Sequence, residues 1–231
     1  MSLIACKNLK LGYEGEVVAE NINFEVNSGD YLCIIGDNGS GKTTLVKTIL
    51  GLNKPLEGEI VFGEGLSRSE IGYLSQRTDV QKDFPASVME IVLSGRLSHM
   101  KHRFFYSKED KRIAMKNMEK LGIANLSKSC FRNLSGGQQQ RTLLARALCS
   151  TEKILFLDEP VSSLDPKATK DMYEIVNELN KNNGTTIVMI SHDIQSVEKY
   201  ATHILNISDH STFSTLEEFM NMEKSGGEQN G

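Results

Sequence analysis

Eight consecutive residues of this chain have the types and the spacing that bind phosphate. Two glycines flank four residues and are followed by a lysine and a hydroxyl residue, as a phosphate loop requires. In chain order the residues are Gly36, Asp37, Asn38, Gly39, Ser40, Gly41, Lys42 and Thr43. The glycines permit a tight turn, so that successive backbone N–H groups and the start of a helix point at one anion. Because Lys42 can reach the outer phosphates and Thr43 can bind Mg²⁺, the segment predicts a site for a nucleoside triphosphate.

The elements on either side of this loop agree with a phosphate site. Residues 31–35 form a short apolar run that predicts a buried strand. Residues 44–50 predict a helix, which ends at Gly51. A glycine-rich turn that binds no ligand is the alternative, and the agreement of strand, loop and helix disfavours it.

A pair of acids forms the second chemical feature. The apolar run at residues 154–157 predicts a strand that ends in Asp158 and Glu159. Carboxylates at such a place cost free energy unless a cation or a reaction needs them. In phosphate-loop enzymes an Asp at this position helps to hold Mg²⁺, and an adjacent Glu can polarise an attacking water as general base. Two acids in an ordinary turn after a strand are the alternative.

A third feature is a predicted helix that begins with two glycines. The segment consists of Leu134, Ser135, Gly136, Gly137 and Gln138. Ser135 and Gln138 have the spacing of a capping box, but each glycine weakens the first turn by roughly 1 kcal/mol relative to Ala. A bare backbone at a helix N-terminus is what close approach to a phosphate requires. Since one phosphate loop already serves one nucleotide, we expect this helix to complete a site shared between two chains.

The composition of the whole chain narrows the class of protein. The 231 residues carry a formal net charge of −4 and no block of five like charges, which argues against a nucleic-acid partner. No apolar run approaches the ~18–20 residues that span a bilayer, and the N-terminus lacks the pattern of a signal peptide. The four cysteines show no C-x-x-C spacing and are expected to be reduced. We therefore expect a cytosolic chain whose work at a membrane requires a partner.

The apolar pattern changes twice along the chain. Strands are predicted at residues 3–11, 22–26, 59–62, 71–75, 154–157, 185–190 and 203–207. After residue 152 the strands alternate with helices at 168–181 and 193–200, which implies a largely parallel sheet covered by helices. Between residues 88 and 151 the pattern is helical instead, and Ser107 with Asp110 makes a capping-box start for one of these helices.

The segment 134–138 is identified as the signature of ABC-type ATPases, and residues 3–207 resemble the nucleotide-binding subunits of ATP-binding-cassette systems. The family's other motifs occur in the family's order. Tyr13 matches the aromatic residue that stacks on adenine, Gln76 matches the Q-loop glutamine, and His192 matches the switch histidine. The D-loop is matched by Ser163, Leu164 and Asp165.

The resemblance implies an α/β fold with a RecA-like P-loop NTPase core, a mostly parallel sheet and an N-terminal antiparallel β subdomain. The whole chain is expected to be one ABC ATPase domain. Residues 1–87 and 152–223 should form the nucleotide-binding core, and residues 88–151 an inserted helical subdomain that carries the signature. The polar, glycine-rich tail at 224–231 is expected to be disordered.

A mechanism follows from the resemblance. Two chains form a head-to-tail homodimer in which the phosphate loop of one chain, with Thr44, and the signature segment of the other enclose each ATP. The D-loop lies at the dimer interface. Thr43, Gln76 and Asp158 organise Mg²⁺. The catalytic residues are Glu159, His192 and Gln76. Glu159 positions the attacking water, and His192 contacts the γ-phosphate.

The resemblance also implies what the ATP is used for. A single cassette with a compact helical lobe favours a transporter ATPase subunit at the cytoplasmic face of the cell membrane. Import is favoured over export because exporters of the family often fuse the cassette and the membrane domain in one chain. Its expected partners are integral membrane permease subunits and an extracytoplasmic substrate-binding protein, with no nucleic acid. A soluble ABC ATPase of DNA repair or translation is the alternative from another class.

The segment after the Q-loop carries the only indication of the transported substrate. Gln76–Arg77, residues 83–85, residues 88–96 and the run 138–141 together resemble the ATPases of zinc and manganese importers. Siderophore and heme importers share part of this pattern and are the alternative. Phe84, Phe104 and Phe105 are either anchors for a permease or core of the helical lobe, and the sequence leaves both open.

Overall fold

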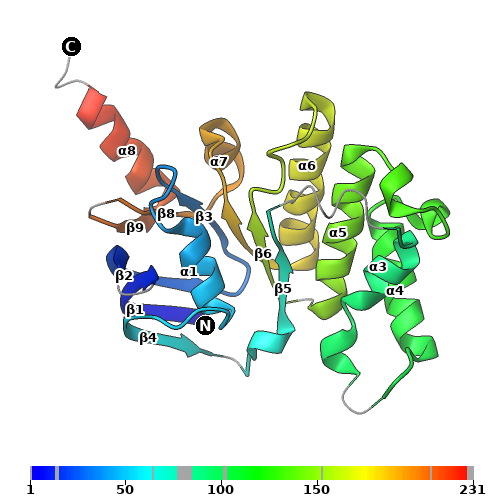
Figure 1. Ribbon diagram of the computed structural model, residues 1–231. Coiled ribbons are helices and arrows are strands. Elements are labelled where there is room, and N and C mark those ends of the chain that lie inside the picture. The colour runs from blue at the N-terminus through cyan, green and yellow to red at the C-terminus, as the bar shows by residue number, and fades with distance from the viewer. Residues whose placement is uncertain are drawn as a thin grey trace. The chain divides into compact units, whose positions relative to one another are not determined.

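The computed structural model describes residues 2–13, 16–63, 65–76, 85–100, 103–151, 153–208 and 210–227. The chain forms two compact units (Figure 1). Unit 1 consists of Met1–Arg68 and Thr186–Gly231, and unit 2 consists of Ser69–Thr185. The functional division into a core and a helical insertion at 88–151 stays a prediction of the sequence.

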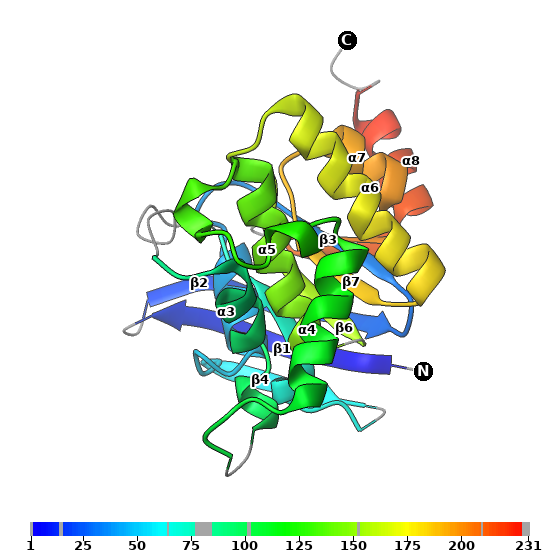
Figure 2. The ribbon, with the colours of Figure 1, turned by 90° about the vertical axis from the view of Figure 1, so that its right-hand side faces the viewer.

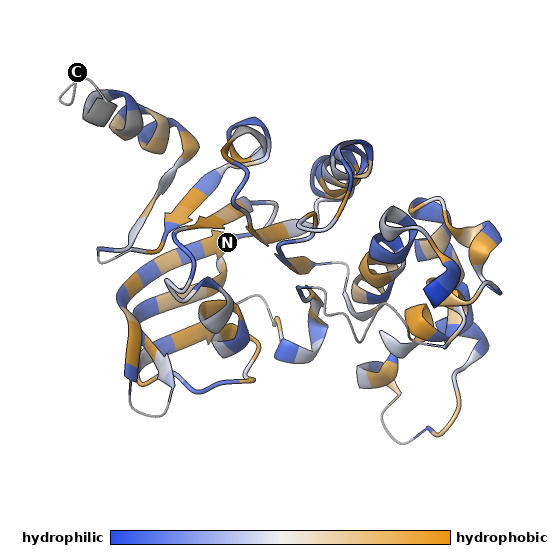
Figure 3. Cartoon of the chain, turned by 45° about the horizontal axis from the view of Figure 1, so that its top comes forward, coloured by the Kyte–Doolittle hydropathy of each residue, from blue (hydrophilic) through white to orange (hydrophobic). Residues whose placement is uncertain are grey.

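An antiparallel sheet opens unit 1. Its strands are β1 (Ser2–Tyr13), β2 (Glu16–Asn27) and β4 (Glu57–Phe62), in the order β2-β1-β4. Hydrophobic and hydrophilic residues are interspersed along these strands (Figure 3), and they alternate regularly in the second half of β2. In β2 this alternation buries Ile22, Phe24 and Val26 and leaves the residues between them exposed. The expected N-terminal antiparallel β subdomain is therefore confirmed.

The other strands of unit 1 pair mostly in parallel. The apolar strand β3 (Tyr31–Ile35) lies between β7 (Thr186–Ile190) and β8 (His203–Asn206), and both pairings are parallel. Strand β9 (Thr212–Thr215) pairs antiparallel with β8. Helix α1 (Lys42–Ile49) follows β3, and α7 (Ile194–Tyr200) connects β7 to β8. Strand, loop and helix thus occur at the phosphate loop as expected.

Helix α8 (Leu216–Gly227) extends into the segment that the sequence predicts to be disordered. Residues 224–227 are helical, and residues 228–231 lie outside the described part of the chain. The helix starts at a reciprocal cap, in which Glu218 N donates to Thr215 Oγ1 and Thr215 N donates to Glu218 Oε2. At the other end the Ser225 hydroxyl donates to Asn221 O at 2.8 Å. These local hydrogen bonds extend the helix despite the polar, glycine-rich composition.

Unit 2 combines two parallel strands with four longer helices. Strand β5 (Ile71–Leu74) pairs with β6 (Ile154–Asp158). The helices are α3 (Val88–Ser94), α4 (Lys108–Lys120), α5 (Gly136–Ser150) and α6 (Pro166–Asn183). Helices α3, α4 and α5 pack on one another (Figure 2). A Cβ on Gly95 would lie 2.0 Å from Arg146 O, so glycine is needed where the chain after α3 meets α5.

Capping boxes start the three helices of this group. Ser107 with Asp110 begins α4 and Ser135 with Gln138 begins α5, which confirms both expectations from the sequence. Helix α3 begins with a third box, made by Ser87 and Glu90. The same serine-to-acid spacing was present in the sequence and could have been found there.

The buried carboxylate of Asp110 connects α4 to its surroundings. It accepts hydrogen bonds from Ser107 N at 2.8 Å, Arg103 Nη1 at 2.9 Å and Arg96 Nε at 3.2 Å. Arg96 also donates to Cys149 O at the end of α5. Burial alone would raise the pKa of Asp110, but the hydrogen bonds from Ser107 and the two arginines hold this pKa well below its usual range.

Replacing Asp110 by Asn is expected to lower the free energy of unfolding by about 3 kcal/mol, because two arginines then lose their common counter-charge. Since the folded-state pKa is depressed, this stabilisation is complete above the ordinary Asp pKa of about 4 and is lost as the pH falls below it. Urea unfolding at pH 7 should show the full difference, and the difference should shrink in acid. Glu119→Gln, an exposed change on the same helix, is the control. Equal stabilities of Asp110→Asn and the unmodified chain at pH 7 would contradict this role.

The structure also describes the state of the cysteines and the apolar character of the helices. All four cysteines are free thiols, as expected, and burial raises the pKa of Cys6 and of Cys33 to about 12. Among the described residues, no helix combines the length and apolar character needed to cross a membrane.

Candidate nucleotide site

The phosphate loop connects β3 to α1 within unit 1. Gly36 has φ 141° and Gly41 has φ 102°, both in the region that side chains disfavour. A Cβ on Gly36 would also lie 2.3 Å from Ile207 O and 2.9 Å from the Ser40 hydroxyl. The two glycines are therefore required by backbone conformation, and at Gly36 by space as well.

The interior of this loop is polar and positively charged. Lys42 is only 6% exposed, and its Nζ donates to Gly36 O at 2.8 Å and to Asp37 O at 2.6 Å. The Ser40 hydroxyl is buried and has no hydrogen-bond partner among the described residues. A buried hydroxyl without a partner is costly, and a phosphate oxygen would satisfy it. The lysine, the hydroxyl and the loop backbone therefore fit the phosphates of a nucleotide.

Tyr13 is held beside the start of α1. Its hydroxyl lies 3.1 Å from Thr44 Oγ1 and 3.1 Å from Asn53 Nδ2. These two contacts fix the position of the aromatic side chain of Tyr13, which is 45% exposed. An exposed, oriented ring can stack on a flat base. Asn53 was missed from the sequence, because no local pattern relates it to a tyrosine 40 positions earlier.

His192 leaves the sheet beside the phosphate loop. It lies two residues after Ile190 of β7, and Ile190 is paired in parallel with Ile34 of β3. The loop and His192 therefore emerge from the same edge of two neighbouring strands, where ligands of parallel sheets bind. Asp193, the next residue, caps α7 by accepting from Ser196 N. The structure thus brings His192 and the loop to one edge of unit 1.

Strand pairing also brings together three predicted site residues of unit 2, Gln76, Asp158 and Glu159. Leu74 of β5 is paired with Leu157 of β6, so Gln76 and the two acids leave neighbouring strands at one edge. Gln76 Nε2 donates to Glu159 Oε2 at 2.9 Å. Glu159 has φ 47°, a conformation that costs a non-glycine residue roughly 1–3 kcal/mol and is commonest at functional sites.

Asp158 is buried at the end of β6 and accepts a hydrogen bond from Tyr73 Oη at 3.4 Å. Burial, and secondly the charge of Asp158, raise the pKa of Tyr73 well above its usual range. The tyrosine thus stays a neutral donor to the carboxylate. Tyr73 was not singled out from the sequence, since a single tyrosine in a strand has no distinguishing local pattern.

The signature segment and the D-loop share one cavity in unit 2. The cavity has a volume of about 270 Å³, and its lining includes Ser135, Gly137, Gln138 and Asp165. The Asp165 carboxylate accepts from Lys167 N and Ala168 N and so caps α6. A Cβ on Gly137 would lie 3.1 Å from the Ala168 Cβ, which shows how closely the two helix starts approach. Two motifs that lie about 30 residues apart in the sequence are therefore neighbours.

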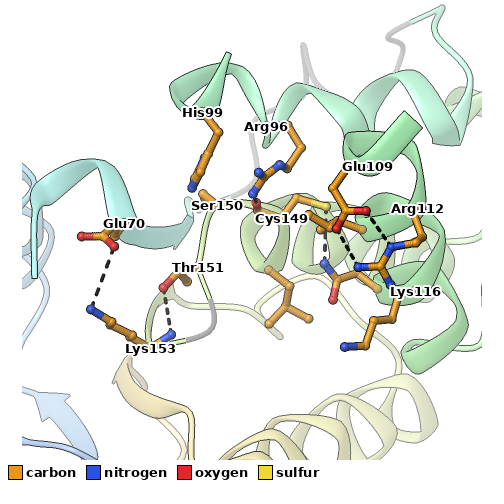
Figure 4. A pocket seen from close by; sticks show the side chains of 13 residues that line it. Glu70, Arg96, His99, Glu109, Arg112, Lys116, Cys149, Ser150, Thr151 and Lys153 are labelled. Carbon is orange, nitrogen blue, oxygen red and sulfur yellow. Dashed lines mark hydrogen bonds and ion pairs between the residues drawn. The ribbon is translucent and has the colours of Figure 1, made fainter. Parts of the chain in front are cut away.

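Another cavity of unit 2, with a volume of about 570 Å³, contains none of the predicted site residues (Figure 4). Three ion pairs involve its charged side chains: Arg96 with Asp110, Arg112 with Glu109, and Lys153 with Glu70. These pairs neutralise much of the charge that lines the cavity. We therefore assign the candidate nucleotide site to the residues of the sequence motifs and not to this larger cavity.

The phosphate loop and His192 in unit 1, with the acids and the signature helix in unit 2, define an α/β nucleotide-binding protein. The family model described as ABC transporter matches residues 19–162. The chain therefore belongs to the ABC transporter family. The expected ATP binding and ATPase activity agree with this family, whose members bind ATP and hydrolyse it in a reaction coupled to transport.

Relatives named for metal transport match most of the chain. It is 38% identical over 201 residues to the manganese transport system ATP-binding protein MntB of Bacillus subtilis, covering 86% of this chain and 80% of the relative. It is 38% identical over 216 residues to the zinc uptake system ATP-binding protein ZurA of Listeria monocytogenes, covering 89% and 82%. The resemblance to zinc and manganese importer ATPases is thus confirmed.

Solved structures agree with the expected fold class. An inward-facing structure described as a metal-chelate type ABC transporter has a TM-score of 0.85 and 31% identity, covering 94% of this chain and 85% of that one. A dimeric, post-hydrolysis ATP-binding cassette bound to ADP and Pi has a TM-score of 0.74 and 27% identity, covering 92% and 98%.

The sequence left open whether Phe84, Phe104 and Phe105 belong to the core of the helical lobe. Phe104 and Phe105 are strongly exposed, so neither belongs to the core of this chain. Phe84 and Arg77 lie outside the described residues.

Proposed function

We propose that this chain is the ATP-hydrolysing subunit of an importer for zinc or manganese ions. It would act at the cytoplasmic face of the membrane through a separate permease, supplied by an extracytoplasmic binding protein. The observation that carries the proposal is the 38% identity to a manganese transport ATPase and to a zinc uptake ATPase over 86% and 89% of this chain. The metal-chelate type neighbour supports the alternative, a ferric-siderophore or heme importer.

The proposed mechanism requires two copies of the chain. The phosphate loop of one copy and Ser135, Gly136 and Gly137 of the other enclose each ATP, so that the start of α5 supplies N–H donors to the outer phosphate. The capped start of α5 and its closeness to the D-loop in unit 2 support this arrangement, as does the dimeric relative. Loss of the γ-phosphate removes the group that both copies hold, and the dimer can open.

Within each site the proposed roles follow from side-chain chemistry. Lys42 neutralises phosphate charge, and Tyr13 stacks on the base. Thr43, Gln76 and Asp158 offer the oxygen ligands that Mg²⁺ prefers, and Mg²⁺ held there would neutralise further phosphate charge. Glu159 takes the proton of the attacking water, and His192 donates a hydrogen bond to the γ-phosphate.

Uptake measurements distinguish the possible substrates. The chain would be co-purified with its membrane partner, placed in vesicles, and tested in parallel for ATP-dependent uptake of zinc, manganese and a ferric siderophore. Uptake of zinc or manganese is expected, and Glu159→Gln in the same preparation should abolish it. Uptake of the ferric siderophore alone would contradict the metal-ion assignment. ATPase activity that responds to DNA or ribosomes, without any membrane partner, would contradict the transport function itself.

A further inference from the structure

Two adjacent aromatic side chains project from unit 2 just before α4. Phe104 is 92% exposed and Phe105 is 85% exposed, more than any other large apolar side chain of the described residues. Such exposure means that almost no neighbouring side chain surrounds either ring. Exposing two large apolar groups side by side is unfavourable in water, so an apolar or interfacial environment is expected to cover them.

The chain on both sides of this pair is held in place. Arg103, directly before the phenylalanines, donates to the Asp110 carboxylate at 2.9 Å, and its N–H donates to Met100 O. Ser107, which follows Tyr106, donates to the same carboxylate through its hydroxyl at 2.7 Å. Because one buried carboxylate anchors both flanks, the outward position of the two rings is part of the ordered structure.

Positive charge gathers on the helix that follows. The exposed cations of α4 are Lys108, Lys111, Arg112, Lys116 and Lys120, against two exposed acids, Glu109 and Glu119. Glu109 is already paired with Arg112, whereas Lys108 and Lys111 form no ion pair with the described residues. The chain as a whole has a net charge of −4, so this helix departs from the sign of the rest. Both ribbon views place α4 at the outside of its unit (Figures 1 and 2).

We propose that Phe104, Phe105, Lys108 and Lys111, here named the aromatic-basic tip, bind the surface of an anionic lipid bilayer. Aromatic rings are favourable at the level of lipid headgroups, and lysines nearby are attracted to anionic lipids. The exposed ring pair followed by lysines without ion-pair partners among the described residues combines the apolar and the cationic groups that an anionic bilayer surface attracts. The inference goes beyond the proposed function, because it gives the ATPase subunit a lipid contact of its own.

Vesicle binding by the purified chain tests the proposal without a permease. The probes are vesicles of phosphatidylcholine alone and of phosphatidylcholine with phosphatidylglycerol, and bound protein is measured by sedimentation at low and high salt. Binding is expected only with phosphatidylglycerol and should weaken as salt rises. Two double variants should each weaken vesicle binding by about tenfold or more: Phe104→Ser/Phe105→Ser and Lys108→Glu/Lys111→Glu.

Matched controls separate the tip from general surface effects. The variant Leu52→Ser removes another apolar side chain, which is 66% exposed. The double variant Lys170→Glu/Lys181→Glu reverses the charge of two lysines on α6. Both control variants should leave vesicle binding unchanged. ATPase activity in the absence of lipid should be the same in all these variants, so loss of vesicle binding is distinguishable from failure of the ATPase function. Absence of binding to anionic vesicles, or equal binding by all variants, would overturn the proposal. Retained vesicle binding with loss of the co-purified permease in Phe104→Ser/Phe105→Ser would show a protein contact and would also overturn it.

Discussion

Replacing Glu159 by Gln is expected to lower the rate of ATP hydrolysis by about 10²- to 10⁴-fold while ATP binding is retained. Gln has nearly the same shape and can still accept the hydrogen bond that Gln76 Nε2 donates to Glu159 Oε2 at 2.9 Å. It cannot take a proton from water, so the γ-phosphate remains in place. Because that phosphate is held by both copies in the proposed mechanism, the variant should accumulate as a dimer in ATP.

Two measurements check this prediction. Phosphate release under saturating ATP gives the turnover, and size-exclusion chromatography with and without ATP gives the oligomeric state. Glu178→Gln, which changes an exposed glutamate on α6, is the matched control and should behave like the unmodified chain. A Glu159→Gln variant with full turnover would exclude Glu159 as the base. One that remains monomeric at saturating ATP would contradict the shared site.

Replacing Lys42 by Ala should reduce ATP affinity, turnover or both by about 10²- to 10³-fold, since a charged donor to the phosphates is removed. The structure indicates that the loss of affinity and turnover should come from the phosphate loop itself. The ammonium group is buried between Gly36 O and Asp37 O, so its position is set before any nucleotide arrives. A preorganised charge costs little to orient during binding and reaction.

The same variant needs a control for folding, because two loop carbonyls lose their donor. Thermal unfolding without nucleotide compares the stability of Lys42→Ala with that of the unmodified chain. Lys47→Ala changes another lysine on α1, in its last turn, and should leave the binding of a fluorescent ATP analogue intact. Normal nucleotide affinity and turnover in a folded Lys42→Ala protein would show that this loop is not the phosphate site.

Residues related by short, regular spacing were predictable from the sequence alone. The capping boxes at Ser107 and Ser135 involve residues three positions apart, so their hydrogen bonds depend only on the local backbone. The phosphate loop is equally local, since eight consecutive residues set its turn, its charge and its helix start. The alternating pattern in the second half of β2 likewise reflects one buried and one exposed face.

Contacts between distant residues were decided only by the tertiary structure. The Gln76–Glu159 hydrogen bond joins residues 83 positions apart, and the contact between Tyr13 and Asn53 joins residues 40 apart. Nothing in a local pattern encodes such distances, because they depend on which strand pairs with which and in what register. The exposure of Phe104 and Phe105 was likewise left open by the sequence, because burial of an apolar side chain depends on which other elements pack around it. The sequence by itself thus determined the chemical groups and their local supports, whereas strand pairing and packing decided which of those groups meet.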